Sequence, residues 1–188
     1  MSTIVLYLGG MAGDFLVSCL NPAQFESIDV MVTLKPEFGK LKKFWQMTTE
    51  EKRAYINSFS SDAVLSSHDT DFSKLYPNRT IRITCSDSGT LLKLSSRFRA
   101  LNRSTVIEHL CEQHNFHIET FDQEYSAMCT DWINGNTFPV EFDIANIYTD
   151  KFVNNFVNFC DANLITYNLD RVTELHNTWR KQNENFNR

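Results

Sequence analysis

The chain has 188 residues (21.8 kDa), which is the size of one domain and too short for a two-domain enzyme. With 42% hydrophobic and 13% aromatic residues it has enough apolar surface to build a core, which excludes a wholly disordered chain. The net charge of -5 and the pI near 5.5 exclude a protein that binds nucleic acid through charge alone, without regard to sequence.

The sequence shows neither a membrane span nor an export signal. No run reaches the roughly 18 consecutive apolar residues that a transmembrane helix needs, and no basic segment precedes the apolar start. The five cysteines are odd in number and lie among apolar neighbours, which favours reduced thiols over disulfides. We therefore expect a cytoplasmic protein.

The clearest local pattern lies at the start of the chain. An apolar run from Thr3 to Leu8 is followed by the glycine-rich stretch Gly9 to Gly13, and a second apolar run begins at Asp14 and ends before Asn21-Pro22. β-branched and aromatic residues favour a strand for the first run, and the proline ends the second run as a helix. The pattern predicts strand, glycine loop and helix. Residues 28–34 fit either a short strand or a loop.

Helix and strand patterns alternate in the next part of the chain. Thr48 and Glu51 have the spacing of a capping box, which predicts a helix from Thr48. Short strands are predicted over Ala63 to Ser67, directly before His68, and over Arg79 to Cys85. Both predicted strands run into polar residues.

The remainder is mostly helical. Apolar spacing and cap residues predict helices over Thr90 to Leu101, Ser104 to His114 with Ser104 as N-cap, Phe121 to Ile133, Asp150 to Cys160 under an aspartate cap, and Asn168 to about Phe186. Residues 134–136 are expected to form a loop and residues 139–142 a short extended piece. The order of elements predicts a single α/β domain over residues 1–188, with a small, mostly parallel sheet wrapped by helices. Residues 1–101 form its strand-rich, nucleotide-binding-like core, and residues 102–188 are mostly helical.

Three polar clusters follow the predicted strands: Gly9 to Asp14, His68 to Asp71, and Ser86 to Gly89. In open parallel α/β sheets, ligands bind at the carboxyl ends of the strands. If the three strands are neighbours, the clusters line one crevice. This convergence is the main indication of function in the sequence.

The glycine loop has two interpretations. Glycines between a strand and a helix let backbone N–H groups approach a phosphate at the helix N-terminus. The stretch is not a Walker A motif, because Asp14-Phe15 stand where lysine and serine or threonine follow the last glycine. In the other interpretation the glycines only make a tight turn and Asp14 caps the helix, where it competes with a phosphate for the same donors.

The first two clusters resemble the P-loop sulfotransferase-like family. In that family the first loop, roughly Pro-Lys-Ser-Gly-Thr-Thr, holds the 5′-phosphosulfate of the donor 3′-phosphoadenosine 5′-phosphosulfate (PAPS). The matching stretch here is Gly10 to Phe15, with Met11 in place of the lysine. The second strand of many members ends in Lys-Thr-His, and Ser66-Ser67-His68 lies at that place. The resemblance implies that His68 is the general base that deprotonates an acceptor hydroxyl.

The resemblance also implies a second phosphate site. The family's third strand runs into an arginine and, further on, a serine, which bind the 3′-phosphate of the donor. Here Ser86-Asp87 stands where the arginine is expected, Ser95 or Ser96 stands for the serine, and Arg97 or Arg99 supplies charge. The donor-binding residues implied in this way are Gly9, Gly10, Gly13, Asp14, Phe15, Ser86, Ser95 and Arg97. The donor is PAPS or another adenine nucleotide, and no metal is implied.

Two functional hypotheses follow. The first is a sulfotransferase-like group transferase that uses a nucleotide donor and a hydroxyl acceptor. The second is an inactive α/β scaffold that binds protein partners in a larger assembly, because the missing lysine and arginine each remove a charge-assisted contact to a phosphate. Asn-rich and Phe-rich chains of this size resemble phage-encoded accessory proteins, which would place it in the host cytoplasm. An enzyme requires His68 to be exposed near the glycine loop, whereas a scaffold allows it to be buried or turned away.

Two further patterns favour structural interpretations. Three histidines and one cysteine lie close together in the sequence and could suggest a metal site: His109, Cys111, His114 and His117. Because no compact Cys-x-x-Cys pair accompanies them, they are interpreted as surface histidines and a core thiol. The basic residues of the preceding helix and loop are interpreted as a solvated face rather than an anion-binding surface: Lys93, Arg97, Arg99 and Arg103.

Overall fold

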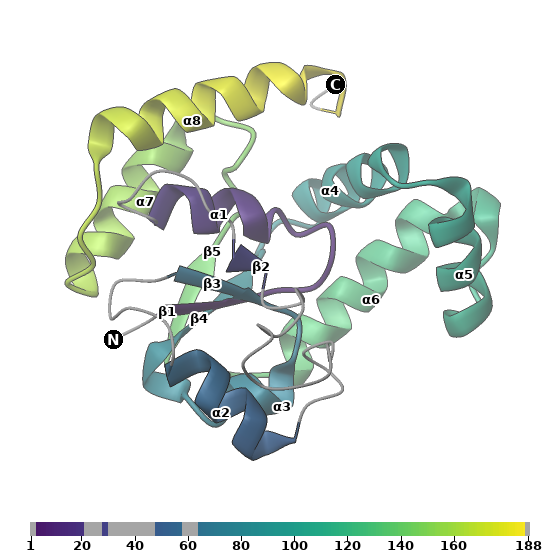
Figure 1. Ribbon diagram of the computed structural model, residues 1–188. Helices are drawn as coiled ribbons and strands as arrows, with labels where there is room; N and C mark the ends of the chain where they lie inside the picture. The colour runs from purple at the N-terminus through teal and green to yellow at the C-terminus, as the bar shows by residue number, and fades with distance from the viewer. Residues whose placement is uncertain (1–2, 21–27, 30–47, 58–63, 187–188) are drawn as a thin grey trace.

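The computed structural model describes residues 3–20, 28–29, 48–57 and 64–186, and its centre is a parallel sheet (Figure 1). The strand order is β2-β3-β1-β4-β5, and all four pairings are parallel. The strands are β1 (Thr3–Leu6), β2 (Ile28–Asp29), β3 (Val64–Ser67), β4 (Thr80–Thr84) and β5 (Val140–Asp143). The predicted α/β class with a parallel sheet is therefore confirmed.

The helices follow the predicted order closely. They are α1 (Gly13–Leu20), α2 (Thr49–Asn57), α3 (Thr70–Ser73), α4 (Ser88–Leu101), α5 (Ser104–His114), α6 (Phe121–Gly135), α7 (Lys151–Ala162) and α8 (Leu169–Gln182). A last 3₁₀ turn, η5 (Glu184–Phe186), follows α8. Among the described residues, none of these helices is long and apolar enough to cross a membrane.

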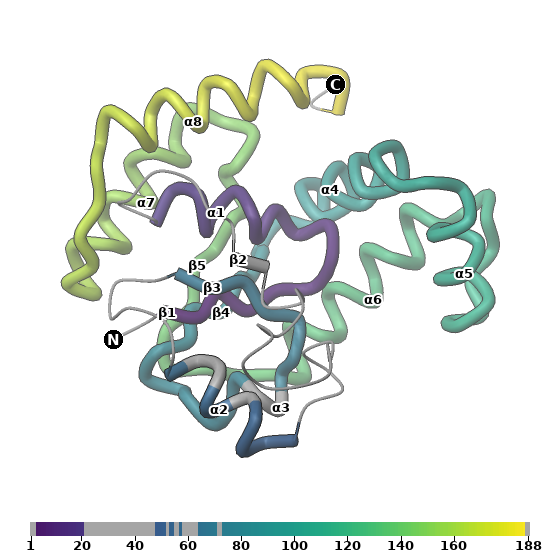
Figure 2. Tube along the Cα trace, in the orientation of Figure 1, coloured from purple at the N-terminus to yellow at the C-terminus, as the bar shows by residue number. Residues whose placement is uncertain are grey.

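The helices form layers around the sheet. Figure 1 shows α1, α7 and α8 on one face and α2 and α3 on the other, while α4, α5 and α6 pack beside them. The tube in Figure 2 brings the C-terminal end of α8 close to α4, and η5 contacts α4. Helix α8, which is distant in the sequence, therefore lies next to both α1 and α4.

The connections from β1 and β4 leave the sheet in opposite directions. The chain after β1 leads to β2 and β3 on one side, whereas the chain after β4 leads to β5 on the other side. Because β1 and β4 are neighbours, their carboxyl ends flank a topological switch point, where parallel sheets leave a crevice. The glycine loop, which follows β1, begins at this point.

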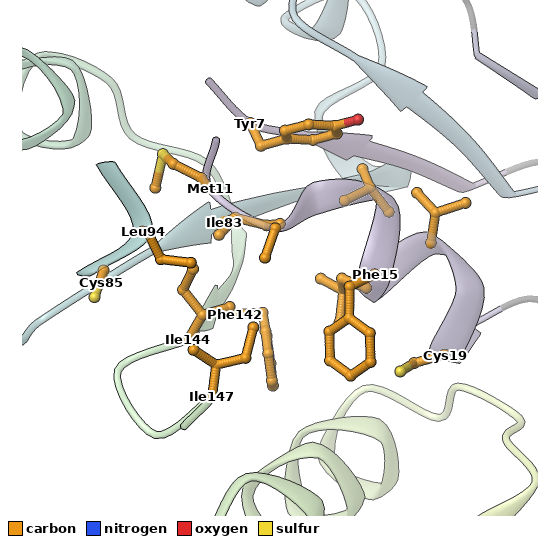
Figure 3. Packing of buried hydrophobic residues seen from close by; sticks show 14 of the residues in the cluster. Tyr7, Met11, Phe15, Cys19, Ile83, Cys85, Leu94, Phe142, Ile144 and Ile147 are labelled. Atoms are coloured by element: carbon orange, nitrogen blue, oxygen red, sulfur yellow. The ribbon is translucent and has the colours of Figure 1, made fainter. Parts of the chain in front are cut away.

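One apolar core joins the sheet to α1, α7 and α8. Phe15 of α1 packs against Phe152 and Trp179, with ring centroids 5.3 and 5.4 Å apart. Figure 3 shows Phe15 pointing toward these helices, whereas Tyr7 lies on the opposite side of the start of α1. Helix α1 is therefore packed on two faces, one against α7 and α8 and the other against Tyr7, and this packing fixes the position of the glycine loop before it.

The capping box at the start of α2 is confirmed. The Thr48 backbone N–H donates to Glu51 Oε2 at 2.8 Å, and the Glu51 N–H donates to Thr48 Oγ1 at 3.3 Å. These reciprocal bonds satisfy two of the donors that a helix start leaves without partners. Helix α2 begins at the next residue, as the spacing predicted.

One cap prediction is wrong and another is right in position only. Ser104 is the first residue of α5 rather than its N-cap, because the N–H groups of Val106 and Ile107 both bond to the carbonyl of Arg103. Asp150 is the N-cap residue of α7, but its side chain makes no cap bond and is paired with Arg180.

The extended piece predicted over residues 139–142 forms β5, which pairs with β4. The loop predicted over residues 134–136 begins two residues later than expected, since α6 continues to Gly135. Of the segment 28–34, residues 28–29 form β2 and residues 30–34 lie outside the described residues.

Burial of His176 makes the fold sensitive to acid. Its ring is 1% exposed and stacks on Phe152, and its Nε2 lies 2.8 Å from the carbonyl oxygen of Ile147. Burial lowers the pKa of His176 below its usual 6.5. The unfolded chain therefore takes up this proton first as the pH falls, so the stability that the neutral ring contributes above about pH 6.5 is lost below it.

We expect the free energy of unfolding to fall between pH 7.5 and 5.5 more steeply in the wild type than in His176→Gln, as measured by urea denaturation. The glutamine variant removes the titrating group, so the comparison is between slopes rather than between absolute stabilities. Parallel slopes would contradict the assignment of a neutral, buried His176.

Candidate functional site

A hollow of about 610 Å³ opens at the carboxyl ends of β1 and β3. Its first wall is the glycine loop with the start of α1, and its second wall is the C-terminal half of α4. The third wall is α8. The lining side chains outside the loop are Tyr7, His68, Arg97, Phe98, Leu101, Asn102, Leu175, Thr178, Trp179 and Gln182.

His68 lies directly after β3, with its ring exposed and facing this hollow. Its Nδ1 lies 2.7 Å from the backbone carbonyl oxygen of Tyr7, and the two rings meet edge to face at 4.5 Å. A carbonyl oxygen only accepts hydrogen bonds, so Nδ1 carries the proton of the neutral ring and Nε2 keeps its lone pair. The imidazole is thus held in the tautomer that can accept a proton at Nε2.

The glycines of the loop make room for aromatic rings. Gly10 has φ +82° and a Cβ there would lie 2.9 Å from Phe98, while a Cβ on Gly13 would lie 2.1 Å from the ring of Tyr7. Gly9 accepts a hydrogen bond from Tyr125 through its carbonyl, at 2.9 Å. The loop is therefore a tight turn packed by aromatic side chains, which agrees with the structural interpretation of its glycines.

The start of α1 still presents donors to the hollow. Gly13, Asp14 and Phe15 all line it, and the first N–H groups of a helix have no acceptor within the helix. The intrahelical pattern begins with the Leu16 N–H, which donates to the Ala12 carbonyl at 3.2 Å. The positive end of the helix dipole is therefore directed at this space.

Asp14 places a carboxylate at the same position. The side chain is exposed, and its Oδ1 accepts a hydrogen bond of 2.5 Å from Tyr7 Oη. Tyr7 thus contacts Asp14 through its hydroxyl and His68 through its carbonyl and ring. Tyr7, the residue directly after β1, therefore positions both the Asp14 carboxylate and the His68 imidazole.

Arg97 supplies the cation of the hollow. Its Nε donates to Asn183 Oδ1 at 2.5 Å, and its guanidinium lies over the ring of Trp179, 5.5 Å from the centroid. Burial lowers the pKa of Arg97, and the negative charge of Asp14 acts in the opposite direction. The expectation of a merely solvated face is therefore wrong at Arg97.

The other basic residues of α4 do not share this surface. Lys93 lies over the ring of Tyr148 at 5.7 Å, and Arg99 is paired with Asp122 at 3.8 Å. Arg103 is exposed at the start of α5. The basic side chains of α4 point in different directions around the helix axis, and of these four described residues Arg97 alone lines the hollow.

The third predicted cluster has a structural role. Asp87 is the N-cap of α4 and accepts a bond of 2.6 Å from the Thr90 N–H, while Ser86 donates to Asp143 at 2.5 Å. Ser95 is 2% exposed and donates to the carbonyl of Leu91 at 2.9 Å. Ser86 and Ser95, both predicted to bind the donor, therefore lie outside the lining of the hollow.

Sequence reasoning missed the wall that α8 contributes. Leu175, Thr178, Trp179 and Gln182 line the hollow, whereas the helical spacing of the apolar members indicated only a core face. Trp179 performs both roles, since it packs on Phe15 and carries Arg97 on its ring. No local pattern distinguishes such a residue from an ordinary core residue.

The described residues contain no group of three or more histidine, cysteine or acidic side chains that could hold a metal ion. His109, His114 and His117 are exposed, and Cys111 is partly buried. The other four cysteines are buried free thiols. Burial raises the pKa of Cys85, Cys129 and Cys160 to about 12, so these thiols are poor nucleophiles at neutral pH.

Comparisons with family models, with curated proteins and with solved structures found no match to this chain.

Proposed function

We propose that this chain is a sulfotransferase-like group transferase in which His68 removes the proton from an acceptor hydroxyl. The observation that carries the proposal is the setting of His68. Its ring is exposed and lines the same hollow as the glycine loop, and the neutral ring presents Nε2 as an acceptor because Nδ1 donates to the Tyr7 carbonyl. Imidazole is the side chain most often used as a general base in enzymes.

The proposed reaction moves a group from a nucleotide donor to the hydroxyl. His68 Nε2 takes the hydroxyl proton while the acceptor oxygen bonds to the transferred group. The bond from that group to the donor phosphate breaks, and its electron pair leaves with the phosphate. Arg97 places a positive charge in the hollow, which favours the charge that develops on the leaving phosphate.

The residues of the hollow fit one anionic group better than two. PAPS carries a second phosphate on its ribose, for which the family supplies an arginine and a serine. Ser86 and Ser95 are bonded elsewhere, and Arg82 is buried in a pair with Glu141. We therefore propose an adenine nucleotide held through one anionic end, at Arg97.

Nucleotide binding is the first test. We expect isothermal titration to give saturable heat with ATP or with adenosine 3′,5′-bisphosphate, and GTP serves as the base control. Arg97→Gln should weaken this binding about tenfold or more, because it removes a charge-assisted contact. Arg103→Gln, at an exposed position away from the hollow, is the matched control. Absence of heat with both ATP and adenosine 3′,5′-bisphosphate would overturn the proposed adenine-nucleotide transferase, whatever the result with GTP.

Loss of His68 should slow transfer strongly while the chain stays folded. In His68→Gln we expect transfer from radiolabelled PAPS or ATP to a panel of hydroxyl compounds to fall by about 10²- to 10⁴-fold. Because the ring is exposed, the melting temperature and the nucleotide Kd should stay unchanged. The control is His109→Gln on α5. Equal rates in wild type and His68→Gln would remove His68 from the mechanism.

A binding or structural scaffold is the second candidate. It is favoured by the loop, where the rings of Phe98 and Tyr7 fill the space beside Gly10 and Gly13 and where Asp14 stands at the start of α1. Under this proposal the α/β frame docks a protein partner, as in a phage assembly. The nucleotide titrations separate the two candidates, because the scaffold requires none of them to bind.

A further inference from the structure

Two opposite charges line the hollow without neutralising each other. Asp14 lies at the start of α1 and Arg97 lies on α4, and no ion pair joins them in the described part of the chain. They are nevertheless close enough for the charge of Asp14 to act on the pKa of Arg97. The hollow therefore has an anionic end and a cationic end, and each is available to a ligand.

Different partners hold the two charges apart. Arg97 is fixed toward α8 by its bond to Asn183 and by the ring of Trp179. Asp14 is fixed on the other side by Tyr7, whose hydroxyl donates to Oδ1. Within the described residues Oδ2 of Asp14 accepts no hydrogen bond, so one oxygen of an exposed carboxylate remains available.

The anionic end lies beside His68. Tyr7 contacts Asp14 through its hydroxyl and His68 through its ring, so the carboxylate and the imidazole are arranged around one aromatic side chain. A ligand that presents a hydroxyl to His68 therefore shares the hollow with Asp14, which lies at the hydroxyl end of the Tyr7 ring. A carboxylate repels an anionic group at this place and attracts a cation.

From this juxtaposition we infer that the acceptor carries a protonated amine in addition to its hydroxyl, with the ammonium on Asp14 and the hydroxyl on His68. The assignment of the hydroxyl rests on the proposed transferase function, whereas recognition of the amine depends on Asp14 alone. Phe98, Leu101 and Trp179 give the hollow apolar walls, which suit an apolar body between the polar groups. The anionic donor binds at the Arg97 end and the cationic acceptor at the Asp14 end, so the opposite charges of the hollow keep the two ligands in separate places.

The test compares three ligands that differ in one charge. Tyramine, 4-ethylphenol and 3-(4-hydroxyphenyl)propionate share a phenol and differ in carrying an ammonium, no charge or a carboxylate. We expect tyramine to bind at least about tenfold more tightly than 4-ethylphenol in isothermal titration, and the carboxylate to bind most weakly. In Asp14→Asn this preference should disappear, because the amide keeps an acceptor for Tyr7 but has no charge. Asp170→Asn, at an exposed position in the first turn of α8, is the control.

Equal affinity for the three ligands, no binding of tyramine, or a preference that survives in Asp14→Asn would overturn the inference. The nucleotide titrations are separate and report on the transferase. If a nucleotide binds and the amine preference is absent, the inference fails and the transferase stands. If the amine preference is present and no nucleotide binds, the transferase fails and Asp14 remains an amine-recognition residue.

Discussion

We expect Gly13→Ala to lower the free energy of unfolding by about 3 kcal/mol or more. A Cβ at this position would lie 2.1 to 2.2 Å from three ring carbons of Tyr7, far inside van der Waals contact. The ring cannot easily move away, because its hydroxyl is bonded to Asp14 and its edge packs on His68. Urea denaturation followed by circular dichroism measures the loss.

Gly135→Ala is the matched control. No atom lies within 4 Å of a Cβ built on Gly135, which ends α6, so alanine there should be neutral or stabilising by about 0.5 kcal/mol. Wild-type stability in Gly13→Ala would mean that Tyr7 does not pack on this glycine. If the expected loss is found, substitutions at Gly13 are unsuitable for testing nucleotide binding, because they act on the fold first.

Removing the partner of a buried charge should have an effect of similar size. We expect Glu141→Ala to lower the free energy of unfolding by about 3 kcal/mol, because it leaves the Arg82 guanidinium uncompensated. The Arg82 side chain is 4% exposed, and its guanidinium donates to Glu141 Oε1 and to the Ile133 carbonyl, both at 2.5 Å. Glu141 also accepts the Phe138 N–H at 3.1 Å. Chemical denaturation compares the variant with the wild type.

The double variant Arg82→Met with Glu141→Ala separates the charge from the lost contacts. Replacing both members of a buried pair with apolar groups is often neutral, so the double variant should recover most of the loss. A double variant that is less stable than Glu141→Ala would show that Arg82 contributes through packing rather than through its need for a counter-ion.

The fold was largely predictable because its signals are local. The apolar run before the glycine loop, the capping box at Thr48 and the helical spacing of the late segments each depend on a few neighbouring residues. The cap at Ser104 was misplaced by one residue, and the side chain of Asp150, the N-cap residue of α7, pairs with the distant Arg180 instead of making a cap bond. The pairing of β5 with β4 was not predictable, since it joins segments separated by three helices.

The site was predictable where it follows a strand end. The glycine loop and His68 line one hollow, as expected from parallel strands that are direct neighbours. Ser86 was assigned to the same crevice by the same reasoning, yet polar residues at a strand end also cap the next helix and tie down the next strand. The contribution of Trp179 and the opposition of Asp14 and Arg97 depend on distant parts of the chain, which no spacing rule brings together.

The pairing of Arg82 with Glu141 also bears on how the chain assembles. During synthesis β4 leaves the ribosome well before β5, because α4, α5 and α6 lie between them. Until β5 arrives, β4 is an open edge strand, the kind of surface on which other chains add by backbone pairing. A charged side chain in the middle of that edge opposes such addition, and Arg82 gains its counter-ion only when β5 docks. The charge on Arg82 therefore disfavours pairing of β4 with other chains and favours β5, where the residue in register with Arg82 is Glu141.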